Sequence, residues 1–338
     1  MLRGRRKALI WLCGLIAITL VLFGCSGQDA KQEAKDEPQQ GQAENSEASW
    51  PTKEIEVVYH SKAGSGGDIF LRAMGKAAEP MLGQPWVVNN LTGASGANAW
   101  DYVAKAAPDG YTILGMSSTI VTSPLQNKMP ISYQDFDPVA MMFIDPIVIF
   151  VPADSPYQTL GEMIEAARQE PGKLKWAGGT AGNIEFVGAR ELMKVADFKA
   201  SLVPFEGGGD AVVSVLGGHL DAGIGEYAEM KASVEAGKIR ILATFNLLPD
   251  NPDIQTVEEA GYPEVKLEKF RGIFVPKGTP AEIIDRLVEV MKDVYHDPDF
   301  KRYYEEGNLI PAFAAKEEFT KVIENQYKQV EESLKNIN

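Results

Sequence analysis

Four glycine-rich segments contain the residues of this chain that are best suited to bind a small anion. Each follows a short β-branched run and precedes a helical pattern; they are residues 63–68, 92–96, 177–183 and 205–210. Glycine lets backbone N–H groups approach a ligand closely, and the helix that begins there adds partial positive charge. Small hydroxyl side chains such as Ser65 add donors without bulk. Loops of this kind can bind carboxylate or phosphate without lysine or arginine.

Each loop also has a purely structural interpretation. A glycine-rich turn between a strand and a helix is often only a tight connection. Asp68 and Asp210 each stand where a helix begins and could serve as N-caps, and Glu206 could be a solvated surface charge. Four such loops in two series of strands nevertheless favour a shared cleft, because ligands bind at the carboxyl ends of strands in α/β sheets.

The sequence carries no recognisable catalytic or cofactor motif. No glycine loop continues into Gly-Lys-Ser/Thr, the dinucleotide fingerprint is broken, and neither G-x-S-x-G nor H-E-x-x-H occurs. Two cysteines exclude a disulfide framework and a multi-cysteine metal site, and three scattered histidines disfavour zinc. A net charge of -14 argues against nucleic-acid binding. We therefore expect no catalytic residue, no metal, no cofactor and no nucleic-acid partner. His60 could face the cleft, but a satisfied polar histidine is its simpler role.

The elements that position these loops follow an α/β pattern. Short β-branched runs predict strands at residues 55–59, 86–89, 111–116, 147–151, 174–177, 202–205, 222–225, 239–245 and 272–276. Helical patterns cover residues 69–81, 97–107, 160–169 and 281–296, with further helices between the later strands and two more toward the end. This alternation predicts right-handed crossovers and mostly parallel sheets. Because the pattern restarts after Pro146, we expect two α/β lobes with a ligand cleft between them.

The N-terminus indicates export. Residues 3–7 are basic except for one glycine, and no charged residue occurs from Ala8 to Phe23, which is typical of a signal peptide over residues 1–24. The stretch ends Leu-Phe-Gly-Cys, which resembles the lipobox of bacterial lipoproteins, so Cys25 would carry the lipid. Cys13 would leave with the signal, so Cys25 would have no disulfide partner. A stop-transfer anchor with an incidental cysteine is the alternative.

Residues 25–50 are expected to form a disordered tether. They contain mostly Gln, Glu, Ala, Ser, Lys and Asp, and such a composition cannot bury enough apolar surface to offset the cost of ordering. A lipid anchor followed by a polar tether would hold the folded part at the extracytoplasmic face of the cell membrane.

From Trp50 to about Gln329 the chain resembles the extracytoplasmic solute-binding proteins of the tripartite tricarboxylate transporters, the Bug family. Segments throughout the folded part carry the resemblance: AGSGGD at 63–68, LGQP at 82–85, GASG at 93–96, APDGYT at 107–112, PGKL at 171–174, VPF at 203–205, LGGH at 216–219 and AGKIR at 236–240.

The resemblance implies a two-lobe periplasmic-binding-protein fold of type II with a hinge and an interlobe cleft. Lobe 1 would comprise residues 51–145 plus 276–338 and lobe 2 residues 146–275, with crossings near 143–146 and 270–274. In the family, the first glycine loop and the loop that opens the second lobe hold a carboxylate. The expected ligand-binding residues are Ala63, Gly64, Ser65, Gly66, Gly67, Asp68, Ser95, Ser117, Gly178, Gly179, Thr180, Asn183, Phe205, Glu206 and Glu229.

The resemblance further implies a monomeric, lipid-anchored receptor that delivers a small carboxylate to the permease subunits of a tripartite transporter. The alternative is a sensor that presents the bound solute to a two-component kinase. Many relatives carry a lysine where this chain has Glu206, and an acidic residue there would repel a polyanion such as citrate. A monocarboxylate, or an amino acid whose ammonium meets Glu206, Glu226 or Glu229, is therefore the more plausible ligand class.

The lipobox-like segment makes a direct prediction about membrane attachment. If Cys25 is the lipidated first residue of the mature protein, Cys25→Ala should release the protein from membranes or block its maturation. Membrane fractionation and the apparent mass of the product measure this. Normal processing with unchanged membrane retention of the variant would contradict the lipoprotein assignment.

Overall fold

Two β-sheets form the framework of the part of the chain that the structure, a computed structural model, describes. This part comprises residues 50–180, 182–205 and 207–337. The expected signal peptide, Cys25, nearly all of the expected tether, and Glu206 lie outside the described residues.

The first sheet has six strands in the order β11-β4-β10-β3-β1-β2. Its strands are β1 (Ile55–Tyr59), β2 (Trp86–Asn90), β3 (Thr112–Ser117), β4 (Phe136–Asp145), β10 (Lys269–Pro276) and β11 (Ile310–Ala315). Strand β1 runs parallel to β2 and β3. Strand β10 runs antiparallel to both β3 and β4, and β11 pairs antiparallel with the other edge of β4.

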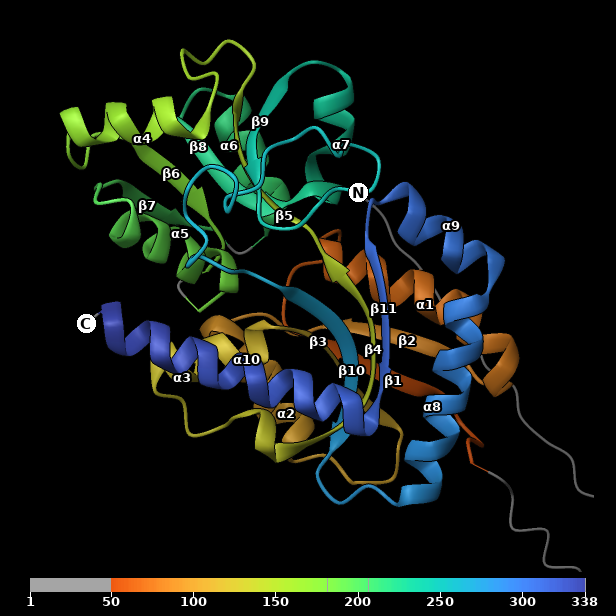
Figure 1. Ribbon diagram of the computed structural model, residues 1–338. Helices are drawn as coiled ribbons and strands as arrows, with labels where there is room; N and C mark the ends of the chain where they lie inside the picture. Colours follow the sequence, from red (N-terminus) through yellow and green to blue (C-terminus); the bar gives the residue numbers. More distant parts are fainter. Residues whose placement is uncertain (1–49, 181, 206, 338) are drawn as a thin grey trace, which may run out of the picture. The chain divides into compact units, whose positions relative to one another are not determined.

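Helices cover both faces of this sheet (Figure 1). One face packs against α1 (Gly66–Leu82), α8 (Ala281–His296) and α9 (Pro298–Glu306), with Phe70 and Leu287 in the shared core. The other face packs against α2 (Ala97–Ala104), α3 (Thr119–Asn127) and α10 (Lys316–Ile337), where Trp100 and Phe319 are fully buried. Burial on both faces explains why β1 reads as a nearly continuous apolar run.

The second sheet has five strands in the order β7-β6-β8-β5-β9. Its strands are β5 (Ile147–Pro152), β6 (Lys175–Gly178), β7 (Ser201–Pro204), β8 (Ala222–Glu226) and β9 (Ile239–Thr244). Helices α4 (Leu160–Gln169) and α5 (Ile184–Val195) share a core with one face, and α6 (Gly208–Leu216) and α7 (Tyr227–Glu235) share a core with the other. Short 3-10 turns occur at Ala94–Gly96 and Tyr133–Asp135.

Two connections join the sheets. Strand β4 ends at Asp145 and β5 begins at Ile147, so Pro146 alone separates them. The return connection precedes Lys269, where β10 begins three residues before the strand that the sequence predicted. All of β10 is therefore hydrogen-bonded within the six-stranded sheet. The sequence analysis had expected the second lobe to extend to residue 275, which lies near the end of this strand.

The architecture confirms the expected α/β fold with two lobes, but the sheets are mixed instead of mostly parallel. Parallel pairing is found in the βαβ units, such as β1 with β3 and β6 with β8. Antiparallel pairing arises where β5 and β10 follow the connections between the sheets, because a strand that enters from the other lobe needs no helical crossover.

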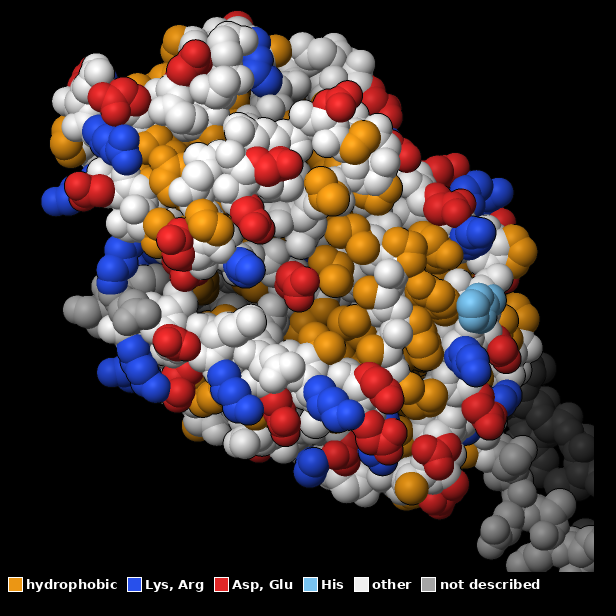
Figure 2. Space-filling model, viewed as in Figure 1, with side chains coloured by type: hydrophobic (Ala, Val, Ile, Leu, Met, Phe, Trp, Pro, Cys, Tyr) orange, Lys and Arg blue, Asp and Glu red, His pale blue; other side chains and the backbone are white. Residues whose placement is uncertain are grey.

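Two strands of the first sheet were not predicted. Strand β4 contains Pro138 and two methionines, and β11 reads Ile-Pro-Ala-Phe-Ala-Ala, so neither shows a β-branched run. The proline in β11 is tolerated because β11 is an edge strand. Figure 2 shows hydrophobic side chains gathered around the position of β11 on this face of the molecule.

The close packing of β10 predicts a strong effect of substituting Gly272. A Cβ atom there would lie 2.4 Å from the Ala140 carbonyl oxygen and 2.9 Å from the Phe319 ring. Gly272→Ala should lower the free energy of unfolding by about 1–3 kcal/mol because the backbone of β4 cannot move aside freely. Urea denaturation measures this. Gly209→Ala in α6 is the matched control: a Cβ there meets nothing within 4 Å, so this helical substitution should be neutral or stabilising. Equal stability of the two variants would contradict the packing argument.

Candidate ligand-binding site

A cavity of about 40 Å³ lies between the two sheets, at the carboxyl ends of β1, β3, β6 and β8. This volume accommodates about three water-sized groups. Several of the predicted ligand-binding residues line it, from both halves of the chain: Ser65, Gly66, Gly67, Ser117, Gly178, Gly179, Asn183, Phe205 and Glu229. The structure thus brings the first, third and fourth glycine-rich segments to one place.

The other predicted residues with described positions do not line this cavity. Ala63 and Gly64 are exposed. Asp68 Oδ2 accepts a hydrogen bond from the Gly64 N–H at 2.9 Å, and Asp68 also binds the Arg72 side chain. Burial raises the pKa of Asp68, but the bonds from Arg72 and Gly64 outweigh this effect and lower the pKa. Asp68 therefore closes the first loop and does not face the cavity.

Ser95 and Thr180 also have structural contacts. The Ser95 carbonyl accepts a hydrogen bond from Ser123 Oγ at 2.9 Å, which ties the second glycine-rich segment to α3. Thr180 Oγ1 donates to Asn183 Oδ1 at 2.8 Å and so shapes the loop before α5. Any contact of these residues with a ligand stays a prediction.

The N-terminus of α1 faces the cavity without a side-chain cap from its own loop. Ser65 occupies the N-cap position with an extended backbone, and its side chain caps nothing. Its Oγ is buried and has no hydrogen-bond partner among the described residues. Gly67 must be glycine, because a Cβ there would lie 1.9 Å from the Tyr59 hydroxyl. Close packing on Tyr59 therefore brings the first turn of α1 to the cavity wall.

Helices α5 and α6 begin at the same cavity in a similar way. Asn183 and Gly207 are their N-cap residues; the Asn183 side chain makes no cap bond to the described residues, and glycine has no side chain that could make one. A Cβ on Gly179 would lie 2.5 Å from Asn183 Nδ2, so glycine is required where this loop folds back. The partial positive charges of three helix N-termini therefore lie at the cavity wall.

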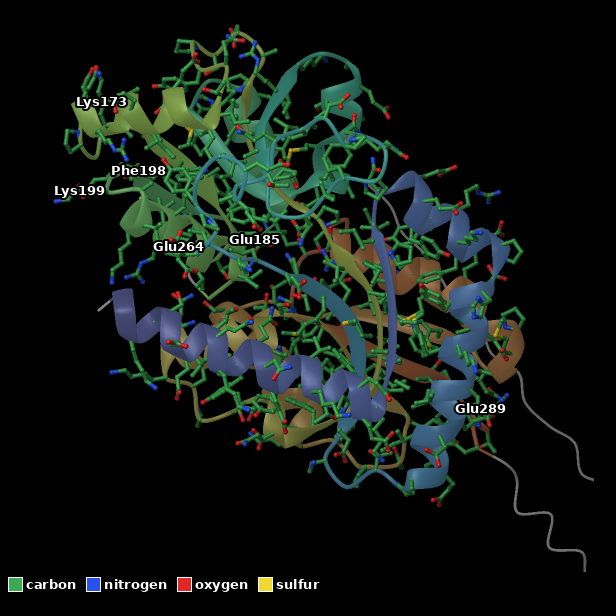
Figure 3. The ribbon with its side chains drawn as sticks, in the orientation of Figure 1. Lys173, Glu185, Phe198, Lys199, Glu264 and Glu289 are labelled. Atoms are coloured by element: carbon green, nitrogen blue, oxygen red, sulfur yellow. The ribbon has the colours of Figure 1, made fainter. Side chains whose placement is uncertain are left out.

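Two buried cations on β10 complete the site, and the sequence analysis missed both. Lys269 and Arg271 are 3% and 1% exposed, and they lie two residues apart on one face of the strand. The Lys269 ammonium, which lines the cavity, contacts both Glu185 of α5 and Glu226 of β8. In Figure 3 the labelled Glu185 lies on α5 at the level between the two sheets.

Arg271 extends this cluster toward the first sheet. Its Nε lies 2.7 Å from Asp145 Oδ2, its Nη2 2.9 Å from Glu226 Oε1, and its Nη1 3.1 Å from the Tyr59 hydroxyl. The carboxylates thus come from both sides of the cleft. We refer to Lys269, Arg271, Asp145, Glu185 and Glu226 as the buried ion cluster.

The cluster fixes the charge of its members. Burial alone would raise the pKa of Glu226, but Lys269 and Arg271 outweigh it and hold the pKa well below the usual range. Burial alone would lower the pKa of Lys269, but Glu185 and Glu226 raise it. Burial raises the pKa of Asp145 to about 6, although Arg271 partly opposes this. The central Lys269–Glu226–Arg271 contacts are therefore ionic at neutral pH.

The pKa values of two further titratable groups in the cavity wall, His60 and Glu229, are shifted in the direction that favours their neutral forms. Burial, followed by the charges of Lys269 and Arg271, lowers the pKa of His60 to about 3. Its Nδ1 has no hydrogen-bond partner in the described part of the chain. Burial and the neighbouring Glu226 carboxylate raise the pKa of Glu229 well above its usual range. The site therefore offers polar groups without adding more charge.

Residues 50–180, 182–205 and 207–337 contain neither a candidate metal-ion site nor a candidate membrane-spanning helix. No His, Cys, Asp or Glu group there is arranged to hold a metal ion. No helix in these ranges is both long and apolar enough to span a bilayer.

Known proteins match the chain over most of its length. The family model described as "Tripartite tricarboxylate transporter family receptor" matches residues 70–338. A UPF0065 protein from the tcbD-tcbE intergenic region of Pseudomonas sp. (strain P51) is 31% identical over 74% of this chain and 76% of its own length. Protein BugT of Bordetella pertussis is 30% identical over 70% of this chain and 74% of its own length. The structure of the periplasmic binding protein BugD superposes with a TM-score of 0.80 at 26% identity, covering 85% of this chain and 98% of BugD.

The partly buried His60 predicts a pH dependence of stability. Because the pKa of His60 is about 3 in the folded protein and near 6.5 in an unfolded chain, only the unfolded state takes up this proton between these values. The free energy of unfolding should therefore fall as pH decreases below 6.5, by about 1.4 kcal/mol per pH unit from this group. His60→Phe should reduce the slope by that amount between pH 6 and 4.

Urea denaturation of both proteins as a function of pH measures the two slopes. The range from pH 7.5 to 9 is the internal control, because this histidine is neutral in both states there and the two curves should run parallel. Parallel curves below pH 6 as well would show that His60 is not buried in its neutral form.

Proposed function

Because the chain belongs to the family of tripartite tricarboxylate transporter receptors, we propose that it is an extracytoplasmic receptor that binds a small carboxylate and delivers it to the membrane permease of such a transporter. The family and the fold are those of solute-binding receptors. Within that family the ligand, the anchor and the partner of this chain are our proposals.

The buried Ser65 hydroxyl at the N-terminus of α1 is the observation that carries the carboxylate proposal. It lines the cavity, and no described residue accepts or donates a hydrogen bond to its Oγ. A buried hydroxyl without a partner costs free energy unless a ligand or water binds it. The N-terminus of a helix favours a negatively charged group, so a carboxylate is the ligand group that satisfies both features.

The charge of the cavity wall supports a ligand with one carboxylate. Glu185 and Glu226 line the cavity, and a second carboxylate on the ligand would meet their negative charge. Glu185 Oε2 has no hydrogen-bond partner among the described residues and could accept one from a ligand ammonium or hydroxyl. A monocarboxylate and an amino acid are therefore both compatible with the site, and a tricarboxylate is disfavoured.

The delivery step rests on the two-sheet architecture and on the N-terminal sequence. The chain crosses between the lobes at Pro146 and in the segment before Lys269, so the lobes can close on a ligand, and a permease can recognise the closed surface. The lipobox-like segment and the polar tether would keep a monomeric receptor beside that permease. We assign no catalysis to the site.

Ser65→Ala tests this function without altering the protein's own contacts. The melting temperature of the wild-type protein is measured with acetate, propionate, glycine, succinate and citrate. The monocarboxylates or glycine should raise it, and citrate should raise it least. Calorimetry with the best ligand should show a loss of about tenfold or more in affinity for Ser65→Ala, because a hydrogen bond to a charged group is lost.

The stability of Ser65→Ala without added ligand should stay close to that of the wild type, since its Oγ has no partner among the described residues. Ser201→Ala, an exposed serine at the start of β7, is the matched control and should bind like the wild type. Full affinity of Ser65→Ala would place the ligand elsewhere, and the absence of any shift across the panel would refute the carboxylate assignment.

A further inference from the structure

The carboxyl group of Glu229 lies at the helix N-terminus that the proposed function gives to a ligand. Glu229 is in the first turn of α7, on the side of the five-stranded sheet. Its Oε1 accepts a hydrogen bond from the Gly66 N–H at 3.1 Å, across the cleft and 163 residues away in sequence. Gly66 is the first residue of α1, whose N–H has no partner within its own helix. A side chain of one lobe therefore caps a helix of the other.

The second oxygen of the same carboxyl group lies against another helix N-terminus. A Cβ on Gly208, the first residue of α6, would be 1.6 Å from Glu229 Oε2, so only glycine allows this approach. Glu229 Oε2 has no hydrogen-bond partner in the part of the chain that the structure describes. The carboxyl group is thus enclosed between the starts of α1 and α6, which is the position that an external carboxylate would take.

The contact that Glu229 makes is weaker than the one a ligand could make. Burial and the neighbouring Glu226 carboxylate raise the pKa of Glu229 well above its usual range and so favour its protonated form, whose oxygen accepts a weaker hydrogen bond than an ionised one. The partial positive charges at the starts of α1 and α6 are not matched by a full negative charge. A ligand carboxylate at the Gly66 N–H would make a charge-assisted hydrogen bond and also reach the Ser65 hydroxyl.

The Gly66 N–H can bond only one carboxyl group in this position. Glu229 Oε1 already accepts it, and the remaining cavity beside Glu229 is small, about 40 Å³. We propose that Glu229 is an internal stand-in for the ligand: its carboxyl group occupies the carboxylate subsite at the start of α1, and a ligand binds by displacing it. This inference rests on the proposed function.

Displacement predicts that removal of the Glu229 side chain changes ligand affinity and the stability of the free protein in opposite directions, which a merely structural role would not do. If the Glu229–Gly66 contact exists only in the ligand-free protein, its removal raises the free energy of that state and leaves the complex unchanged. Affinity should then increase while the stability of the free protein decreases. A residue that only supports the shape of the site would lower both quantities when it is removed.

Calorimetry on the purified full-length protein with acetate, propionate, glycine and succinate tests the proposal. Glu229→Ala should bind the ligands of the wild type about three- to tenfold more tightly, which corresponds to the loss of one competing hydrogen bond. Its melting temperature without ligand should be lower than that of the wild type. Glu229→Gln keeps a neutral oxygen that can accept the Gly66 N–H, so it should bind more weakly than Glu229→Ala and regain stability.

Glu235→Ala is the matched control, because Glu235 is an exposed carboxyl group on the same helix. It should match the wild type in affinity and in stability. Unchanged or weaker binding by Glu229→Ala, with wild-type binding intact, overturns the displacement while the proposed function stands. If neither protein binds any member of the panel, both the carboxylate assignment and this inference fail.

Discussion

The buried ion cluster is the constraint on which the arrangement of the two sheets depends. Removing an ammonium and a guanidinium group from water costs several kcal/mol each, so Lys269 and Arg271 are tolerated only where carboxylates surround them. These carboxylates come from both sides of the cleft: Asp145 from the six-stranded sheet, Glu185 and Glu226 from the other half. Moving the sheets apart would leave Asp145 as the only carboxylate of the cluster beside the two cations. The cluster therefore couples the position of the lobes to the pairing of buried charge, and it places an ammonium group at the cavity.

The local charge of the site is independent of the charge of the whole chain. The protein carries a net charge of -14, yet the wall of the cavity contains three helix N-termini and the Lys269 ammonium. Acidic side chains in the same wall are either paired with the buried cations, as Glu226 is, or neutral, as Glu229 is. A small anion can thus be favoured at short range while the acidic surface repels polyanions at longer range.

Local patterns in the sequence were sufficient for the fold class and for much of the cavity wall. Glycine loops after β1 and β6 predicted a site because they recur at equivalent strand ends in both halves of the chain. Lys269 and Arg271 were missed because a charged residue in an apolar run normally marks the end of a strand, and the carboxylates that neutralise them are 43 to 126 residues away in the chain. Strands β4 and β11 were missed for a related reason: pairing partners, and not β-branched residues, define them. The sequence could not reveal the long-range contacts that stabilise charged residues within β10 and strands that lack β-branched residues.

The place of β10 in the first sheet has a consequence for how the chain reaches this structure. β10 lies between β3 and β4, yet more than a hundred residues that build the five-stranded sheet separate it from them in the chain. During synthesis from the N-terminus, the edges of β3 and β4 that pair with β10 therefore stay unpaired until residues 269–276 have been synthesised. The second lobe is a continuous segment and can collapse first, so the half of the molecule that is made earliest is completed last. Such a topology has a high contact order and exposes two sheet edges for a long time, which favours slow folding and a need for protection against aggregation.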